Sequence, residues 1–118
     1  MALQEEIKRK SESFRELCRS HQVKYVYAFG SAVTERFNEE TSDIDLLIEL
    51  DAPDPVERGE KLMSLWDELE ALFQRKVDLL TEPSIKNPFL RKSIDATKVL
   101  IYDGSGEKVL VWYTWSDS

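Results

Sequence analysis

Two hydrophobic periods alternate along the chain, and they predict alternating helices and strands. Leu3, Ile7, Phe14 and Leu17 recur at helical spacing, which predicts an amphipathic helix over about residues 2–21. Elsewhere, short runs rich in β-branched and aromatic residues are bounded by polar or glycine-containing turns. These runs predict four strands, over residues 23–29, 44–50, 77–81 and 98–102.

A longer helix is predicted after the second strand, because its start carries three capping signals. Asp54 precedes Pro55 and Glu57, so we expect a helix from residue 55 to about residue 74, with the Asp54 side chain as its cap and Glu57 reaching back. The apolar stripe that this helix is expected to bury consists of Leu62, Trp66, Leu69 and Phe73.

The remaining signals complete the prediction of the fold class. Asn87 before Pro88 predicts a further helix that ends near residue 96, and residues 32–37 predict a short one. Because strands and helices alternate, we expect the α/β (α+β) class, with a mixed β-sheet and helices packed mainly on one face. The 118 residues (1–118) fit one domain, since compact domains cluster at about 100–150 residues.

The two ends of this domain differ in pattern. Residues 1–21 form the N-terminal helical segment, whereas residues 103–118 open with the turn sequence Asp103-Gly104-Ser105-Gly106 and predict a C-terminal hairpin extension. Both faces of the stretch 109–115 are apolar, with Trp112, Tyr113 and Trp115 among them. This stretch is either a partner or dimer surface or a simple capping hairpin.

Charge and composition exclude several classes of function. The chain has 16 lysines and arginines against 23 aspartates and glutamates, a net charge of −7, so it offers no basic surface for direct nucleic-acid binding. No apolar run approaches the roughly 20 residues of a membrane span, and the first ten residues are too charged for a signal peptide. We therefore expect neither nucleic acid nor membrane as a partner, and a cytoplasmic location.

The catalytic groups available to this chain are carboxylates, hydroxyls, lysines and arginines. A single cysteine, Cys18, excludes an internal disulfide, and a single histidine, His21, excludes a multi-histidine metal site.

Asp43 and Asp45 are the first candidates for chemistry. Side chains alternate between the faces of a strand, so both carboxylates point the same way, with Cα atoms about 6–7 Å apart. Two such carboxylates repel each other unless a cation lies between them, and hard oxygen ligands suit Mg²⁺. A pair of these ions about 3.5–4 Å apart would fit an in-line phosphoryl or nucleotidyl displacement.

Asp78 is a third carboxylate, within the otherwise apolar run Val77-Asp78-Leu79-Leu80. If its strand pairs beside that of Asp43 and Asp45, Asp78 can complete the cluster, either as a ligand or as the base that takes a proton from the attacking hydroxyl. The alternative is an exposed acid at the end of a half-solvated strand.

Gly30-Ser31 follows the first predicted strand and is a candidate for phosphate binding. Glycine lets the backbone approach a ligand closely, and free amides at a helix start attract phosphate oxygens. The alternative is an ordinary strand-to-helix turn, since Gly-Ser alone is weak evidence. A downstream Ser-Asp-x-Asp on a strand makes the combination more specific.

Phe29-Gly30-Ser31 followed by Ser42-Asp43-Ile44-Asp45 resembles the signature of nucleotidyltransferases of the DNA polymerase β superfamily. The resemblance covers about residues 22–102, including Val77-Asp78-Leu79-Leu80. It is closest to the small stand-alone minimal nucleotidyltransferases (MNT proteins), because larger members carry additional substrate domains. The fold that it implies is the nucleotidyltransferase fold.

This resemblance implies a role for each candidate residue. Gly30 and Ser31 would hold the triphosphate of ATP, Asp43 and Asp45 would ligate two Mg²⁺ ions, and Asp78 would be the third catalytic and metal-binding acid. Family members often show Arg and Gly shortly after Gly-Ser, whereas this chain has Ala32-Val33-Thr34-Glu35-Arg36-Phe37. Arg36 is then the nearby residue that can reach a phosphate.

The resemblance also implies a partner. Many MNT proteins are antitoxins encoded beside a HEPN-domain ribonuclease toxin, and the implied reaction is transfer of AMP from ATP to a tyrosine hydroxyl of that toxin. An acidic domain suits a basic, RNA-binding partner. We expect this chain to form a hetero-oligomer with such a partner or a homodimer. Two alternatives stay open: a non-catalytic antitoxin that acts by binding, and a small-molecule nucleotidyltransferase of the aminoglycoside type.

Overall fold

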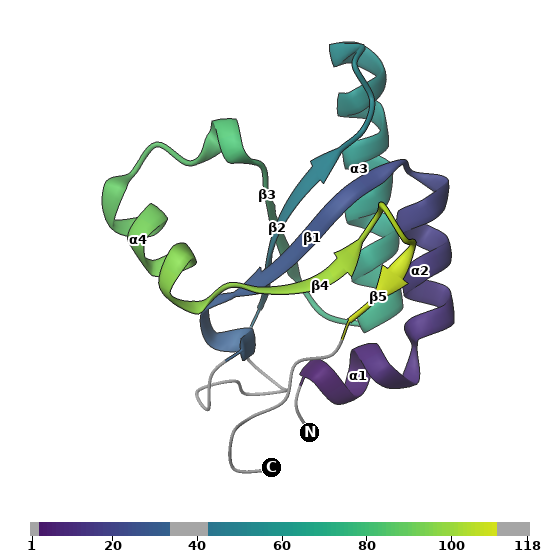
Figure 1. The fold of residues 1–118 in the computed structure, drawn as a ribbon, viewed down its shortest axis with the longest axis horizontal. Coiled ribbons are helices and arrows are strands. Elements are labelled where there is room, and N and C mark those ends of the chain that lie inside the picture. Colours follow the sequence, from purple (N-terminus) through teal and green to yellow (C-terminus); the bar gives the residue numbers. More distant parts are fainter. Residues whose placement is uncertain (1–2, 34–42, 111–118) are drawn as a thin grey trace.

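The computed structural model describes residues 3–33 and 43–110 and shows one five-stranded mixed sheet with helices against it (Figure 1). The strand order is β3-β2-β1-β4-β5, in which β2 and β3 are parallel and the other pairs are antiparallel. The strands are β1 (Val23–Phe29), β2 (Ile44–Leu50), β3 (Val77–Leu80), β4 (Val99–Asp103) and β5 (Lys108–Val109). The mixed sheet that the sequence predicts is confirmed, and β1 and β2 have the predicted bounds.

In the described residues, four α-helices and two short 3₁₀ helices precede the first strand or connect the strands. They are α1 (Leu3–Arg9), α2 (Ser11–Ser20), η1 (Gly30–Val33), α3 (Pro55–Phe73), η2 (Glu82–Ser84) and α4 (Pro88–Thr97). The long helix α3 joins the parallel strands β2 and β3, because a parallel pair needs a crossover connection. No helix in the part of the chain that the structure describes is long and apolar enough to span a membrane.

Alternation along β2 divides the sheet into two faces. Ile44, Leu46 and Ile48 are fully or almost fully buried in the main core, which also contains Phe14 of α2 and Leu69 of α3. The opposite face carries a smaller apolar cluster of Phe29, Leu47 and Ile94, the last of which belongs to α4. The prediction of helices mainly on one face is therefore confirmed, with α4 as the helix on the other face (Figure 1).

The predicted N-terminal helix is wrong in one respect, because it is broken into two. Lys10 leaves helical geometry (φ −107°, ψ 23°) between α1 and α2. Its Nζ donates to the Leu72 carbonyl (2.7 Å), one of the last carbonyls of α3, which have no partner within their own helix. Ile7 and Phe14, on the two sides of the break, are both fully buried. A contact with α3 is not visible in the local period of the N-terminal segment.

Two details of α3 also differ from the prediction. Asp54 occupies the cap position before Pro55, but its side chain makes no capping hydrogen bond. The fully buried stripe is formed by Leu65, Leu69 and Phe73, whereas Leu62 and Trp66 are half-buried at its border.

Two other predicted segments are described only in part. η1 covers the start of the short helix predicted over 32–37, and the remainder of that segment lies outside the described residues. The predicted C-terminal hairpin begins with β5 against β4. Trp112, Tyr113 and Trp115 lie outside the described residues, so the two alternatives for 109–115 stay open.

Side chains of α3 hold the edge strand β3 in place. Ile44 pairs with Val77 and donates its N–H to the Lys76 carbonyl (3.0 Å), so the Val77 peptide groups point away from β2. Trp66 Nε1 donates to the Val77 carbonyl (2.7 Å), and the Val77 N–H donates to Glu70 Oε2 (2.9 Å). Two side chains of α3 thus replace a further strand and position the residue before Asp78.

This contact predicts that Glu70→Ala lowers the free energy of unfolding by about 1–2 kcal/mol, because the buried Val77 amide loses its acceptor. Urea titration of the purified protein measures the change. Glu60→Ala removes the same charge from the exposed surface of α3 and is the matched control, with an expected change within about 0.5 kcal/mol. Equal effects of the two substitutions would contradict the proposed role of Glu70 in holding β3.

Candidate active site

The pairing of β2 with β3 brings the three predicted acids to one face of the sheet. Asp43 directly precedes β2, and Asp45 lies within it, two positions further on. Asp45 is in parallel register with Asp78 of β3, and residues in register on neighbouring strands point to the same face. The structure therefore places Asp78 beside Asp45, and the charges of both Asp78 and Asp43 act on the Asp45 carboxyl group.

The central carboxylate of this cluster is held in an unfavourable electrostatic environment. Partial burial, followed by the charges of Asp78 and Asp43, raises the pKa of Asp45 from 3.8 to about 6. Its neighbours Asp43 and Asp78 are exposed. Ionised Asp45 is thus destabilised by desolvation and by two like charges, a combination that a bound cation relieves.

Gly30 forms a tight bend against Asp45. Phe29 pairs with Asp45 at the end of β1, and Gly30 follows in the left-handed region at φ 69°. A Cβ atom on residue 30 would lie 2.7 Å from Asp45 Oδ2. Glycine is favoured here for two reasons, the backbone conformation and the close approach of the carboxylate.

The bend is also bonded to α4, through Thr97, a residue that no sequence pattern predicts as part of the site. The Gly30 N–H donates to Thr97 Oγ1 (3.0 Å), at the C-terminal end of α4. No local signal marks Thr97, because its partner lies 67 positions away in the sequence.

The other predicted nucleotide contacts are described only in part. The backbone of Ser31 follows Gly30 in η1. Arg36 and Ser42 lie outside the described residues, so the predicted contact of Arg36 with a phosphate stays a prediction.

The donor set of the cluster fits a hard divalent cation that is shared with a substrate. Within residues 3–33 and 43–110, no three His, Cys, Asp or Glu side chains lie close enough together to hold a metal ion on their own. Mg²⁺ in phosphate-transfer sites is typically held by one or two carboxylates together with substrate phosphates. Asp43 and Asp45 supply that number of carboxylates, and the raised pKa of Asp45 marks where positive charge is favoured.

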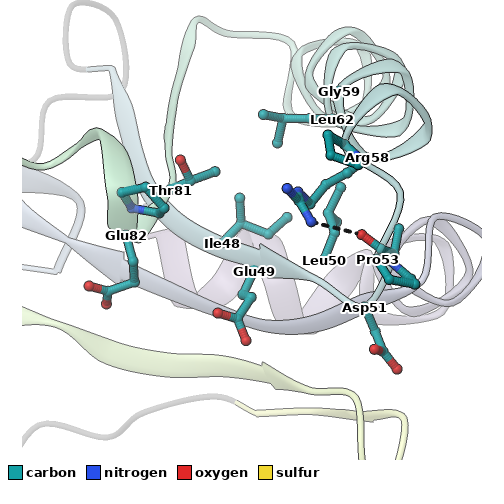
Figure 2. A pocket seen from close by; sticks show the side chains of 13 residues that line it. Ile48, Glu49, Leu50, Asp51, Pro53, Arg58, Gly59, Leu62, Thr81 and Glu82 are labelled. Atoms are coloured by element: carbon teal, nitrogen blue, oxygen red, sulfur yellow. Dashed lines mark hydrogen bonds between the residues drawn. The ribbon is translucent and has the colours of Figure 1, made fainter.

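A separate cavity lies at the opposite end of β2. It measures about 630 Å³, and its lining includes Ile48 and Leu50 of β2, Arg58 and Leu62 of α3, and Thr81 after β3 (Figure 2). Arg58 Nη1 donates to the Ala52 carbonyl (3.0 Å) at its edge. None of the three clustered acids lines this cavity, so the acid cluster and the cavity are distinct features.

Comparison with known proteins identifies the family of this chain. Residues 10–101 match the family model of the nucleotidyltransferase domain. MJ0126 of Methanocaldococcus jannaschii, named as a candidate protein adenylyltransferase, is 40% identical over 87 residues, which cover 74% of this chain and 85% of that protein.

Two solved structures share the fold. One is described as a candidate minimal nucleotidyltransferase and has a TM-score of 0.57 at 25% identity, covering 84% of this chain and 95% of its own. The other is a toxin–antitoxin structure with AMP-PNP, with a TM-score of 0.52 at 22% identity, covering 90% of this chain and 75% of its own. The family match spans most of the chain and contains Gly30, Asp43, Asp45 and Asp78. The chain therefore belongs to the nucleotidyltransferase domain family, as the Gly-Ser and Asp-x-Asp pattern predicts.

Proposed function

We propose that this protein transfers the AMP group of ATP to a hydroxyl group of another protein. The observation that carries the proposal is the cluster of Asp43, Asp45 and Asp78 on one face of the sheet, beside the glycine bend at residue 30. Membership of the nucleotidyltransferase family and the 40% identical relative named as a candidate protein adenylyltransferase support this choice of reaction and acceptor class.

Each residue of the cluster has a role in this reaction. Gly30 would let the backbone approach the triphosphate closely, and the amides that follow it in η1, beginning with that of Ser31, would bind phosphate oxygens. Asp43 and Asp45 would hold up to two Mg²⁺ ions together with phosphate oxygens, and Arg36 would add a further phosphate contact. Bound there, Mg²⁺ neutralises the phosphate charge and favours an in-line arrangement.

Asp78 would accept the proton of the attacking hydroxyl, since it lies in register with Asp45 on the neighbouring strand. The acceptor oxygen then forms a bond to the α-phosphorus, the bond from that phosphorus to the bridging oxygen breaks, and pyrophosphate leaves. The residues of this chain contribute positioning and charge compensation, without a covalent intermediate.

For the acceptor, we propose a tyrosine of a HEPN-domain toxin encoded nearby, with the reaction in the cytoplasm. The likeness of fold to a toxin–antitoxin structure with AMP-PNP is consistent with this assignment. The net charge of −7 favours a basic partner of the kind that binds RNA.

Incubation with labelled ATP, Mg²⁺ and the product of the adjacent gene should place label on that product. Asp43→Asn and Asp45→Asn should each lower the labelling rate at least about a hundredfold, because loss of charge compensation at the phosphates costs several kcal/mol. Glu49→Gln, on the same face of β2, is the matched control and should retain the rate within about threefold. Toxin neutralisation that survives Asp43→Ala and Asp45→Ala would indicate an antitoxin that acts by binding alone.

The raised pKa of Asp45 predicts a pH-dependent stability without divalent cations. The native state binds the Asp45 proton more tightly than the unfolded chain does, so the free energy of unfolding falls as the pH rises from about 4 to about 6. Asp45→Asn should therefore stabilise the protein at pH 8 by about 1–2 kcal/mol, a value reduced for solvent screening, and give no such gain at pH 4. Urea titration in EDTA at both pH values measures this, with Asp67→Asn as the exposed control. A gain that is equal at both pH values would refute the electrostatic explanation.

Two glycine substitutions should have opposite effects. Gly30→Ala places a residue with a Cβ at φ 69° and displaces the Asp45 carboxylate, so we expect a loss of about 1–2 kcal/mol of stability and of at least about tenfold in transfer rate. Gly59→Ala, inside α3, meets no atom within 4 Å and should stabilise by about 0.5–1 kcal/mol. Thermal unfolding and the labelling assay measure both, and full activity of Gly30→Ala would contradict the proposed phosphate bend.

A further inference from the structure

The bend at Gly30, which we propose to bind phosphate and call the phosphate bend, is hydrogen-bonded to the last residue of α4. The Gly30 N–H donates to Thr97 Oγ1 at 3.0 Å, which joins the end of β1 to a helix 67 positions further along the chain. Because Gly30 is in the left-handed region, its peptide orientation decides where the following amides of η1 point.

The direction of this hydrogen bond is fixed because the Gly30 N–H can only donate, and the second contact of the Thr97 hydroxyl is compatible with it. A hydroxyl group has a single proton, and Thr97 Oγ1 donates it to the Ser93 carbonyl (2.9 Å), which can only accept. Toward Gly30, the Thr97 oxygen therefore acts as an acceptor. Both of its bonds are satisfied in one arrangement, so the hydroxyl cannot turn away from Gly30 without losing a partner.

Packing of α4 against the sheet holds this hydroxyl in place. Ile94 is fully buried with Phe29, the neighbour of Gly30, and with Leu47, two positions after Asp45. Ile94 lies three positions before Thr97 and thus on the same side of the helix. This apolar contact packs α4 against β1 and β2, and the hydrogen bond of Thr97 connects the packed helix to the bend at Gly30.

We propose that Thr97 is a positioning residue for the nucleotide phosphates. It holds the Gly30 peptide in the orientation that presents the η1 amides to a triphosphate, and α4 acts as a support for the bend. This inference rests on the proposed function, because it assigns the support of the same phosphate site.

The test compares three variants by calorimetric titration with ATP and Mg²⁺. Thr97→Val keeps the shape of the side chain but removes the acceptor, so the dissociation constant should rise about tenfold. Thr97→Ser keeps the hydroxyl and should bind within about twofold of the wild type. Ser93→Ala removes an exposed hydroxyl of the same helix while keeping the carbonyl that Thr97 uses, and it should bind as the wild type does.

Amide hydrogen exchange at Gly30 tests the bond without nucleotide. Exchange should accelerate at least about fivefold in Thr97→Val and stay near the wild-type rate in Thr97→Ser. Thr97→Ala gives the same comparison should valine not be accommodated. Unchanged exchange, or accelerated exchange with unchanged nucleotide affinity, would overturn the positioning role, as would a serine variant as weak as the valine variant. Absence of nucleotide binding by the wild type, with Gly30 exchange still dependent on Thr97, would instead refute the proposed function.

Discussion

The in-register pairing of β2 with β3 sets the position of every acid in the candidate site. Asp45 and Asp78 are 33 residues apart in number but are partners in a parallel ladder, and Asp43 is on the same face of β2. A parallel pair cannot form through a short turn, so this arrangement depends on α3 as the crossover. The same helix binds the Val77 peptide groups through Trp66 and Glu70. The register that aligns the carboxylates is thus maintained by side chains outside the site.

The electrostatic free energy needed to bring these carboxylates together is offset by apolar burial on the other face of the same strand. Ionised Asp45 is destabilised by burial and by two neighbouring charges, which raise its pKa to about 6. Ile44, Leu46 and Ile48 alternate with it and lie in the main core, and each fully buried aliphatic side chain contributes roughly 1.5–3 kcal/mol. The core therefore outweighs the electrostatic penalty and keeps β2 in place. Local destabilisation supported by surrounding structure is common at functional sites.

Three separate elements meet at Gly30, which explains how a small domain supports a defined site. The residue follows β1, lies where an added Cβ would meet the Asp45 carboxylate of β2, and is bonded to Thr97 of α4. The apolar cluster of Phe29, Leu47 and Ile94 lies directly beside these contacts. The acids and the glycine belong to the sequence pattern that predicts the family, whereas the hydrogen bond from the bend to α4 is visible only in the contacts of this chain.

Properties that depend on neighbours in the sequence could be predicted from the sequence alone. The bounds of β1 and β2, the common face of Asp43 and Asp45 and the bend at Gly30 follow from side-chain alternation and from backbone conformations that favour glycine. Only the tertiary structure decided that Asp78 is the partner of Asp45, that Lys10 breaks the first helix to reach Leu72, and that Thr97 bonds to Gly30. Each of these contacts joins residues more than thirty positions apart, and hydrophobic periodicity carries no information on which distant segments become neighbours.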